Sequence, residues 1–374
     1  MQRIQKKQII EDLKKKMVFL VGPRQVGKTW LAKDIAKNYR NSVYLNYDSL
    51  DDREIIKKEQ WLESTELLIL DELHKMKGWK NYLKGVYDTK ASNLQILVTG
   101  SARLDVFRQS GDSLAGRFYL HHLLPLSLAE LKQLKIEVSI DSLLTRGGFP
   151  EPYLATSDIE AERWRRQYSD SLIRNDILSF DNIENYHNIK DLFEILRNKV
   201  ASPISFASIA RDLAISPSTV KKYISILEAL YVVFQIKPYS KKISRSILKQ
   251  PKIYFYDTAL VRGDEGIKLE NLLALSLLKS IKAENNYLGK DKSLHYLRTK
   301  NQQEVDFLIS DKNNQVENII ELKSSDANLS RSLEYFSKKY DFPGLQLVRN
   351  LKQEKQVDGI KVLRLEDYLK TLYL

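Results

Sequence analysis

The chain of 374 residues contains no cysteine, so it can form neither disulfide bonds nor a metal site built from thiolates. No apolar run is long enough to cross a bilayer, and no secretory signal is recognisable. Internal repeats and low-complexity tracts are missing as well. These absences lead us to expect a soluble cytoplasmic protein made of ordinary folded domains, with no membrane among its partners.

The charge is unbalanced toward basic residues, with 60 Lys and Arg against 48 Asp and Glu and a formal net charge of +12. Such an excess favours polyanionic partners, DNA above all, because it creates a long-range attractive field. A surface of solvated lysines without such a partner explains the same excess equally well. Hydrophobic residues make up 43% of the chain, enough for folded cores, and the length suggests roughly two to four domains.

The segment 22–29 reads GPRQVGKT and fits the phosphate-loop pattern GxxxxGK[ST]. An apolar run typical of a buried strand precedes it, and a helical pattern follows it. A strand, turn and helix in this order aim backbone N–H groups and the positive end of a helix dipole at one point, which suits the phosphates of ATP. Lys28 is expected to reach the β- and γ-phosphates, and the Thr29 hydroxyl to ligate Mg²⁺. The residues predicted to contact the nucleotide are Gly22, Pro23, Arg24, Gln25, Val26, Gly27, Lys28 and Thr29.

A second part of this site follows about forty residues later, where the apolar run 67–70 ends in Asp71 and Glu72. A buried strand with acids at its carboxyl end is typical of a nucleotide-binding sheet. Asp71 is expected to hold Mg²⁺, and Glu72 to orient and polarise the attacking water. Ser101, after the next predicted strand, either contacts the nucleotide or caps a turn.

An arginine that reaches the γ-phosphate is a further part of such sites, and it can come from a neighbouring copy of the chain. Arg117 is the first candidate for this catalytic role. A surface arginine or a salt-bridge partner is the alternative.

The chain divides into four predicted parts. An α/β ATPase core with a parallel sheet covers residues 1–150, and it ends in a segment with two Gly and two Pro that cannot continue a helix. A charged helical stretch, 151–200, is interpreted as a lid or connector. A winged helix is predicted for residues 201–249, and a further α/β domain for residues 250–374.

The predicted winged helix contains a short helix, 206–213, a turn and a longer helix, 218–230. Lys221, Lys222 and Tyr223 stand near the start of the second helix, where a recognition helix meets the edges of DNA bases. These three residues are therefore candidates for DNA binding. Helix-turn-helix units also serve as protein-contact modules, so contact with another protein remains an alternative.

A second group of acids lies on two predicted strands near the C-terminus. Asp306 stands on the first strand, and Glu321 and Lys323 are two residues apart on the second, so they share one face. This arrangement is similar to the PD-(D/E)xK nuclease core, in which acids bind Mg²⁺ or Mn²⁺ and a lysine helps to activate water. Glu270, on a preceding helix, matches an additional acid of that fold. The expected metal ligands are Glu270, Asp306 and Glu321, with Glu321 and Lys323 catalytic, unless the core is degenerate and serves only binding.

Five motifs together resemble a prokaryotic family of AAA-type ATPases. They are residues 22–29, 68–72, 99–101, 114–131 and 147–152. The resemblance implies an ATPase domain, a C-terminal domain that combines a winged helix with a restriction-endonuclease-like core, and oligomers in which a neighbour donates an arginine. The expected fold is thus a multidomain α/β protein, and the expected function is ATP-dependent processing of DNA. A nucleotide-dependent switch or scaffold, or a DNA-binding regulator with an inactive nuclease core, is the alternative.

Overall fold

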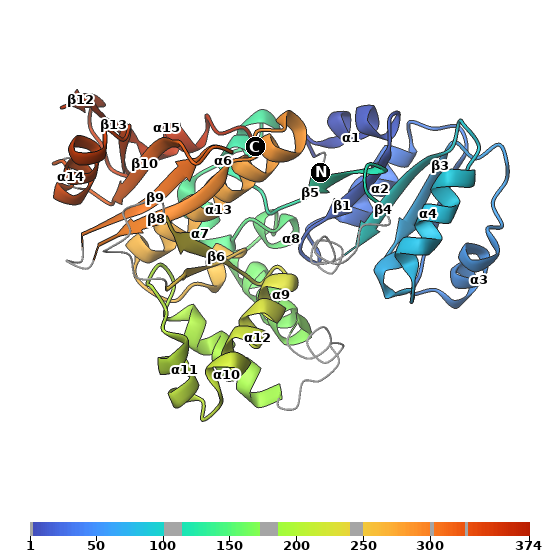
Figure 1. Ribbon diagram of the computed structural model, residues 1–374, viewed down its shortest axis with the longest axis horizontal. Coiled ribbons are helices and arrows are strands. Elements are labelled where there is room, and N and C mark those ends of the chain that lie inside the picture. The colour runs from blue at the N-terminus through green and yellow to red at the C-terminus, as the bar shows by residue number, and fades with distance from the viewer. Residues whose placement is uncertain (1–2, 101–113, 173–185, 240–249, 300–302, 326–327) are drawn as a thin grey trace. The chain divides into compact units, whose positions relative to one another are not determined.

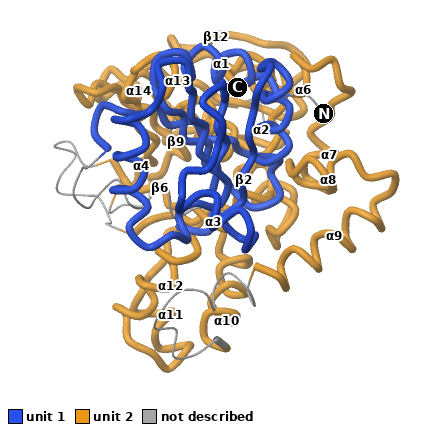
Figure 2. The backbone as a smooth tube through the Cα atoms, turned by 90° about the vertical axis from the view of Figure 1, so that its right-hand side faces the viewer, with its two compact units in different colours: residues 1–124, 229–231 blue, residues 125–228, 232–374 orange. Residues whose placement is uncertain are grey.

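The computed structural model divides into two compact units (Figure 2). Unit 1 comprises residues 1–124 with 229–231, and unit 2 comprises residues 125–228 with 232–374. The residues that the structure describes are 3–100, 114–172, 186–239, 250–299, 303–325 and 328–374. None of the helices in these ranges combines the length and the apolar character needed to cross a membrane.

In its described residues, unit 1 contains a five-stranded parallel sheet with the strand order β2-β3-β4-β1-β5 (Figure 1). Every residue of the two strands β1 and β3 is buried, which explains their uninterrupted apolar sequences and confirms the predicted parallel sheet. The strands are β1 (Met17–Val21), β2 (Ser42–Asn46), β3 (Leu67–Asp71), β4 (Gln95–Gly100) and β5 (Phe118–His122).

The helices of unit 1 alternate with its strands, as right-handed crossovers between parallel strands require. Ser49 caps the helix after β2 by accepting a hydrogen bond from the Asp52 N–H, and Trp79 opens a helix whose apolar side joins the core of β1 and β3. The helical segments are α1 (Lys6–Leu13), α2 (Lys28–Ala36), α3 (Leu50–Lys58), the 3₁₀ turn η1 (Leu73–Lys75) and α4 (Trp79–Thr89).

Unit 2 begins directly after β5, earlier than the boundary near residue 150 that the Gly- and Pro-rich segment predicts. A buried ion pair explains why. The Lys279 ammonium donates to the carbonyl oxygen of Pro125 over 2.9 Å and pairs with the Glu130 carboxylate, and both side chains of the pair are at most 2% exposed. The chain after Leu124 is thereby held to a helix of the C-terminal half, while the division into four parts stays a prediction.

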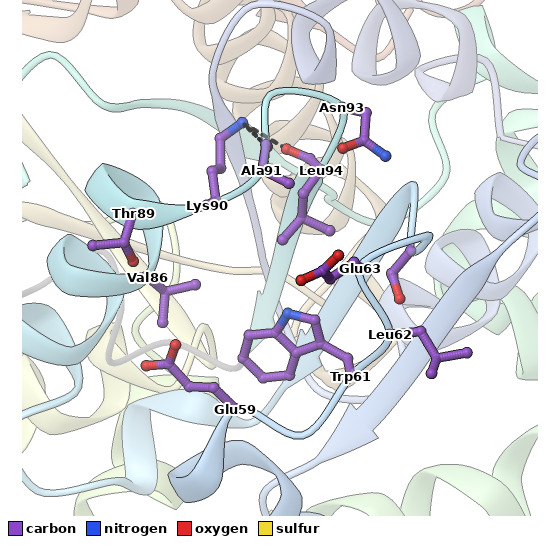
Figure 3. A pocket seen from close by; sticks show the side chains of 11 residues that line it. Glu59, Trp61, Leu62, Glu63, Val86, Thr89, Lys90, Ala91, Asn93 and Leu94 are labelled. Carbon is purple, nitrogen blue, oxygen red and sulfur yellow. Dashed lines mark hydrogen bonds between the residues drawn. The ribbon is translucent and has the colours of Figure 1, made fainter.

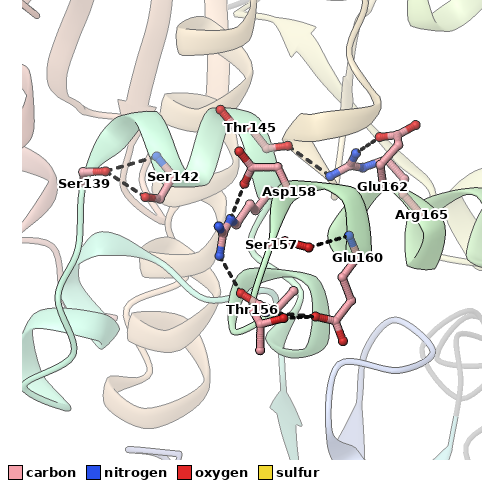
Figure 4. A network of polar contacts seen from close by, with 11 residues as sticks. Ser139, Ser142, Thr145, Thr156, Ser157, Asp158, Glu160, Glu162 and Arg165 are labelled. Atoms are coloured by element: carbon pink, nitrogen blue, oxygen red, sulfur yellow. Dashed lines mark hydrogen bonds and ion pairs between the residues drawn. The ribbon is translucent and has the colours of Figure 1, made fainter.

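Near the start of unit 2, two helices are joined by a network of side-chain contacts (Figure 4). Arg146 pairs with Asp158 at 2.7 Å, and Arg165 donates to the carbonyl oxygen of Thr145, so that α7 and α9 are connected twice. The helices in this part of unit 2 are α6 (Leu128–Gln133), α7 (Ile140–Arg146), α8 (Pro150–Tyr153), α9 (Asp158–Ser171) and α10 (Tyr186–Arg197).

The predicted helix pair of the winged helix is present as α11 (Phe206–Asp212) and α12 (Pro217–Ala229). The predicted first wing strand is β6 (Val233–Pro238). It pairs antiparallel with β7 (Lys252–Phe255) and parallel with β8 (Ser293–Arg298). This strand therefore belongs to the same sheet as the C-terminal strands, and the winged helix as a separate part of the chain stays a prediction.

That sheet has eight strands among the described residues, is mixed, and follows the order β12-β13-β11-β10-β9-β8-β6-β7. Its remaining strands are β9 (Glu304–Ser310), β10 (Val316–Lys323), β11 (Gly344–Val348), β12 (Lys355–Val357) and β13 (Ile360–Arg364). The 3₁₀ turn η4 (Thr258–Leu260) and the helices α13 (Glu265–Leu288), α14 (Arg331–Tyr340) and α15 (Leu365–Leu369) complete the unit.

Candidate functional sites

The phosphate loop connects the carboxyl end of β1 to the first turn of α2. Gly22 has a φ of +151°, and a Cβ atom added there would lie 2.1 Å from the carbonyl oxygen of Leu123, so only glycine fits. Gly27, with a φ of +98°, turns the chain into α2. Arg3 donates from Nη1 to the carbonyl oxygen of Val26 over 2.9 Å, and this hydrogen bond helps to fix the backbone of the loop. The loop thus has the strand–turn–helix context that its sequence predicts.

Lys28 is buried and folds back over this loop. Its ammonium donates to the carbonyl oxygens of Gly22 at 2.9 Å and Pro23 at 2.6 Å. These carbonyls hold the cation at the mouth of the loop, where its charge can meet the phosphates of a nucleotide.

Asp71 ends β3 and gathers hydroxyl groups from three other elements. Its Oδ2 accepts from the Thr29 hydroxyl at 2.8 Å and from the Tyr44 hydroxyl at 2.7 Å, while Thr99 donates to Oδ1. Thr29 and Asp71, predicted as magnesium ligands, are therefore in direct contact. Hard oxygen donors of this kind fit Mg²⁺. The sequence analysis did not predict a role for Tyr44. Its contact with Asp71 depends on the pairing of β2 with β3, which the sequence does not specify.

Glu72 follows Asp71 in the left-handed region, with a φ of +55°. Its N–H donates to the carbonyl oxygen of Thr99 at 3.0 Å, which fixes its backbone beside β4. Burial raises the pKa of the Glu72 carboxyl, and the ammonium groups of Lys75 and Lys28 oppose the rise. The electrostatic contact with Lys28 places the carboxylate on the side of the phosphate loop, as a base acting on a nucleotide requires.

Arg117 is not brought to this site within its own chain. It precedes β5, and its carbonyl oxygen accepts from the N–H of Met17, so it lies where the strands begin, whereas the phosphate loop follows the end of β1. Its guanidinium contacts Asp88 with two hydrogen bonds, of 2.8 and 3.1 Å. A catalytic role of Arg117 therefore requires a neighbouring copy of the chain. Ser101 lies outside the described residues.

A second polar cluster lies in unit 2, where the predicted nuclease-like residues meet. The N–H of Leu322 on β10 donates to Asp306 Oδ2 on β9 at 2.9 Å. Glu321 Oε1 accepts from the Ser330 hydroxyl at 3.0 Å and pairs with the Lys323 ammonium at 3.1 Å. Burial and then the charge of Asp306 raise the pKa of Glu321 to about 7, so these two acids are electrostatic neighbours.

Glu270 joins the same cluster from α13. Burial, and after it the charge of Asp306, raises the pKa of Glu270 to about 7. Its Oε1 accepts from the Tyr254 hydroxyl at 2.7 Å and lies 3.1 Å from the Lys252 ammonium. Lys252 and Tyr254 belong to β7 and were not predicted. Nothing in the sequence around Lys252 indicates that acids surround it.

This cluster does not form a ready-made metal site by simple proximity. No group of three or more His, Asp or Glu side chains among the described residues is arranged to hold a metal ion. One feature nevertheless fits a cation, because Glu321 Oε2 is buried and has no hydrogen-bond partner in the described part of the chain. The predicted ligand set of Glu270, Asp306 and Glu321 thus stays a prediction.

Comparison with protein families identifies the domain that contains the first of these two candidate sites. Residues 14–132, which hold the phosphate loop, Asp71 and Glu72, match a family model described as an AAA domain. Residues 14–132 are an AAA-type ATPase domain. Two domains of unknown function follow, DUF8612 over residues 138–270 and DUF4143 over residues 265–368. The acid cluster draws on both, since Lys252 lies in the first match and Asp306 in the second.

Curated relatives extend over most of the chain. The uncharacterized protein MJ1544 of Methanocaldococcus jannaschii is 26% identical over 364 residues, which covers 88% of this chain and 80% of that protein. The uncharacterized protein Rv2008c of Mycobacterium tuberculosis is 25% identical over 300 residues, covering 78% and 67%. Among solved structures, the Walker-type ATPase PABY2304 of Pyrococcus abyssi has a TM-score of 0.44 at 14% identity, covering 68% of this chain and 93% of that one.

The AAA domain also has a groove of about 700 Å³ (Figure 3). Trp61 and Leu62 line it from the segment before β3, and Lys90 and Leu94 from the segment before β4. The Lys90 ammonium donates to the carbonyl oxygen of Leu94 at 2.7 Å. This groove therefore lies where strands begin, at the edge of the sheet away from the phosphate loop, and is not the nucleotide site.

The three predicted DNA-contacting residues on α12 differ in accessibility. Lys221 and Lys222 are exposed, and the Lys221 ammonium lies 5.4 Å from the centre of the Phe206 ring. Tyr223 is only 4% exposed, so the prediction that it contacts DNA is wrong. Its ring packs inside unit 2 because position 223 falls on the inner face of the helix. Lys221 and Lys222 remain predicted DNA contacts.

Proposed function

We propose that the protein hydrolyses ATP at the site formed by Lys28, Thr29, Asp71 and Glu72. The observation that carries the proposal is the direct contact of Thr29 with Asp71, which joins the phosphate loop to the acidic strand at 2.8 Å. Thr29 and Asp71 would hold Mg²⁺, which neutralises charge on the β- and γ-phosphates when it is bound. The AAA domain match over residues 14–132 supports the same reaction.

Each side chain of this site has a different role in hydrolysis. Lys28 binds the phosphates with its ammonium, in exchange for the carbonyl contacts that now hold it. Glu72 orients the attacking water and takes up its proton, and the raised pKa of its carboxyl makes it a better base than an exposed glutamate. Thr99 and Tyr44 fix the carboxylate of Asp71.

Calorimetry and a phosphate-release assay test this proposal. Lys28→Ala should weaken ATP binding, whereas Glu72→Gln should keep binding and stop turnover. Lys37→Ala, an exposed lysine just after the same helix, is the control and should change neither. Normal turnover by Glu72→Gln would show that the base is misassigned, and no heat of ATP binding by the wild-type protein at millimolar Mg²⁺ would refute the whole proposal.

A second proposed activity is metal-dependent cleavage of DNA at the acid cluster, driven or regulated by ATP. Glu321 Oε2, which has no hydrogen-bond partner among the residues that the structure describes, favours it, because a buried carboxylate oxygen beside Asp306 and Lys323 is suited to a divalent cation. Such a cation, when bound, would activate water and neutralise charge on the scissile phosphate. The net charge of +12 and the exposed Lys221 and Lys222 support DNA as the partner.

Incubation with duplex, single-stranded and branched DNA, with Mg²⁺ or Mn²⁺ and with or without ATP, tests this activity. Glu321→Ala and Lys323→Ala should abolish strand breaks, while Glu317→Ala on the same strand should not. DNA footprints without breaks would instead support a DNA-binding regulator. Partner binding lost in Lys28→Ala but kept in the Glu321 and Lys323 variants would support a nucleotide-dependent switch. Neither cleavage nor DNA-stimulated ATPase activity would contradict the processing of DNA.

A further inference from the structure

Trp30 stands directly after the phosphate loop, in the first turn of α2, and it is 43% exposed. The two residues before it are already engaged in the proposed nucleotide site. Lys28 donates to carbonyl oxygens of the loop, and Thr29 donates to Asp71. An exposed indole ring next to a site for phosphates offers a flat apolar surface to another part of the same ligand.

One face of α2 is directed toward the strands β2 and β3. Thr29 and Lys33 share this face because they are four residues apart on a helix. The Thr29 hydroxyl contacts Asp71 at the end of β3. The Lys33 ammonium lies 4.6 Å from the centre of the Tyr44 ring on β2. This face of α2 therefore belongs to the side of the site where Mg²⁺ is proposed to bind.

Trp30 lies on a different face of the same helix. It shares that face with Asp34, and each residue of an α-helix is turned by about 100° from the one before it, so Trp30 points away from the side of Thr29. Asp34 pairs with Lys6 of α1 at 2.8 Å. The face that carries Trp30 is therefore directed toward α1, and Trp30 stands one helical turn closer to the phosphate loop than this ion pair.

The proposed hydrolysis fixes the direction of a bound triphosphate. Its γ-phosphate must lie on the side of β3, because Asp71 and Glu72 are proposed to act there on Mg²⁺ and on the attacking water. The first hydrogen bond within α2 runs from the N–H of Leu31 to the carbonyl oxygen of Gly27 at 2.9 Å, so the N–H of Trp30 belongs to the turn that faces the phosphates. The ribose and the base, at the other end of the triphosphate, then leave the loop on the side of Trp30.

We propose that the indole ring of Trp30 stacks on the base of the bound nucleotide. This contact contributes affinity for the nucleoside part of ATP, beyond what the loop gains from the phosphates. Every base has a flat aromatic face, so stacking on Trp30 does not distinguish adenine from guanine. The inference rests on the proposed ATP site and adds the residue that lets this site prefer a nucleotide to a chain of phosphates.

Calorimetry of Trp30→Ala with ATP and with tripolyphosphate tests the contact, because tripolyphosphate carries three phosphates and lacks ribose and base. We expect Trp30→Ala to weaken ATP binding by about 10- to 100-fold, the range typical of a base stacked on an aromatic side chain. Binding of tripolyphosphate at the same Mg²⁺ concentration should be unchanged. Trp30→Phe keeps an aromatic ring and should retain most of the affinity for ATP.

Tryptophan fluorescence gives an independent measurement on the same proteins. Stacking on a base changes the emission of an indole ring, so ATP should change the fluorescence of the wild-type protein. The change should disappear in Trp30→Phe, which has no indole at this position. Trp61→Phe is the matched control and should keep both the fluorescence change and the affinity for ATP, because Trp61 lines the groove at the edge of the sheet away from the phosphate loop.

The outcomes separate the inference from the proposal on which it rests. No heat of ATP binding by the wild-type protein would refute the ATP site itself. If the wild type binds ATP, an unchanged affinity of Trp30→Ala would refute only the stacking on Trp30. An equal loss of ATP and tripolyphosphate binding would refute it too, because Trp30 would then act through the shape of the loop. A fluorescence response to ATP that is absent in the wild type, or kept in Trp30→Phe, would have the same meaning.

Discussion

Asp71 depends on groups from four separate stretches of the chain. The hydroxyls of Thr29, Tyr44 and Thr99 all donate to its carboxylate, and its own strand places it at the edge of the sheet. Tyr44 shares Oδ2 with Thr29, so it fixes the oxygen that is closest to the phosphate loop. We therefore expect Tyr44 to be a positioning residue for the proposed magnesium site.

Tyr44→Phe tests this role, because it removes one hydroxyl and leaves the ring in place. We expect ATPase activity at limiting Mg²⁺ to fall by about 10- to 100-fold, as for other residues that orient a ligand, and to recover partly at high Mg²⁺. ATP binding without Mg²⁺ should change little. Tyr39→Phe, whose hydroxyl donates to Gln95 instead, is the control. An unchanged dependence on Mg²⁺ in Tyr44→Phe would exclude the positioning role.

The helices α7 and α9 meet the segment after β7 around a buried carboxyl group. Asp257 caps η4, and its Oδ2 lies 3.7 Å from the Arg165 guanidinium of α9. Gly147 follows α7. Only glycine fits there, because a Cβ atom would lie 2.0 Å from Asp257 Oδ1. The Gly-Gly segment that the sequence marks as a boundary is thus a site of close packing.

Asp257 should make the stability of unit 2 depend on pH. Burial raises its pKa from 3.8 to about 6, against the opposing charge of Arg165. Because the folded pKa exceeds the unfolded one, this carboxyl favours the folded state most below about pH 4 and loses about 3 kcal/mol of that stability as pH rises through 6. Asp257→Asn removes this titrating group. The difference in the free energy of unfolding in urea between the wild type and Asp257→Asn should therefore change by about 3 kcal/mol as the pH rises from below about 4 to above about 6.

The control for this measurement is Asp158→Asn, because Asp158 is exposed on the first turn of α9. Its difference from the wild type should vary little over the same pH range, as expected for an exposed ion pair. If the difference in the free energy of unfolding between Asp257→Asn and the wild type is equally independent of pH, Asp257 does not take up a proton on folding.

The buried strands and the phosphate loop could be predicted from the sequence, whereas the surroundings of Lys252 and Tyr223 could not. Apolar runs such as 67–70 specify buried strands, and the strand–turn–helix order around the loop 22–29 can be read from its sequence, so both were confirmed. The roles of the loop residues in binding a nucleotide stay predictions. The burial of Lys252 against Glu270 and Glu304 was not predictable. Whether a lysine is solvated or buried against acids depends on strands that lie far apart in the chain. The prediction for Tyr223 was wrong for a related reason, since an amphipathic helix can carry a tyrosine on its buried face or on its exposed face.

The proposed ATPase site of unit 1 has no arginine from Arg117 within its own chain. Unit 1 holds the residues proposed to bind ATP and polarise water, but Arg117 lies where the strands of the same sheet begin, away from the phosphate loop, and pairs with Asp88. That pair is exposed and contributes little to stability, so Arg117 is free to change partners at low cost. We therefore expect ATPase activity to need an assembly in which Arg117 of one copy reaches the nucleotide of the next.

Mixing two inactive variants tests this assembly. Arg117→Ala should lower the maximal rate by about 1,000-fold or more while ATP still binds, as expected for an arginine that stabilises transferring phosphate. Lys28→Ala lacks the nucleotide site but keeps Arg117. A mixture of the two should regain activity, because a Lys28→Ala copy donates its arginine to an intact site of its neighbour. Asp88→Asn should stay active. A mixture no more active than its components, from proteins that sediment as oligomers, would exclude Arg117 as the donated group.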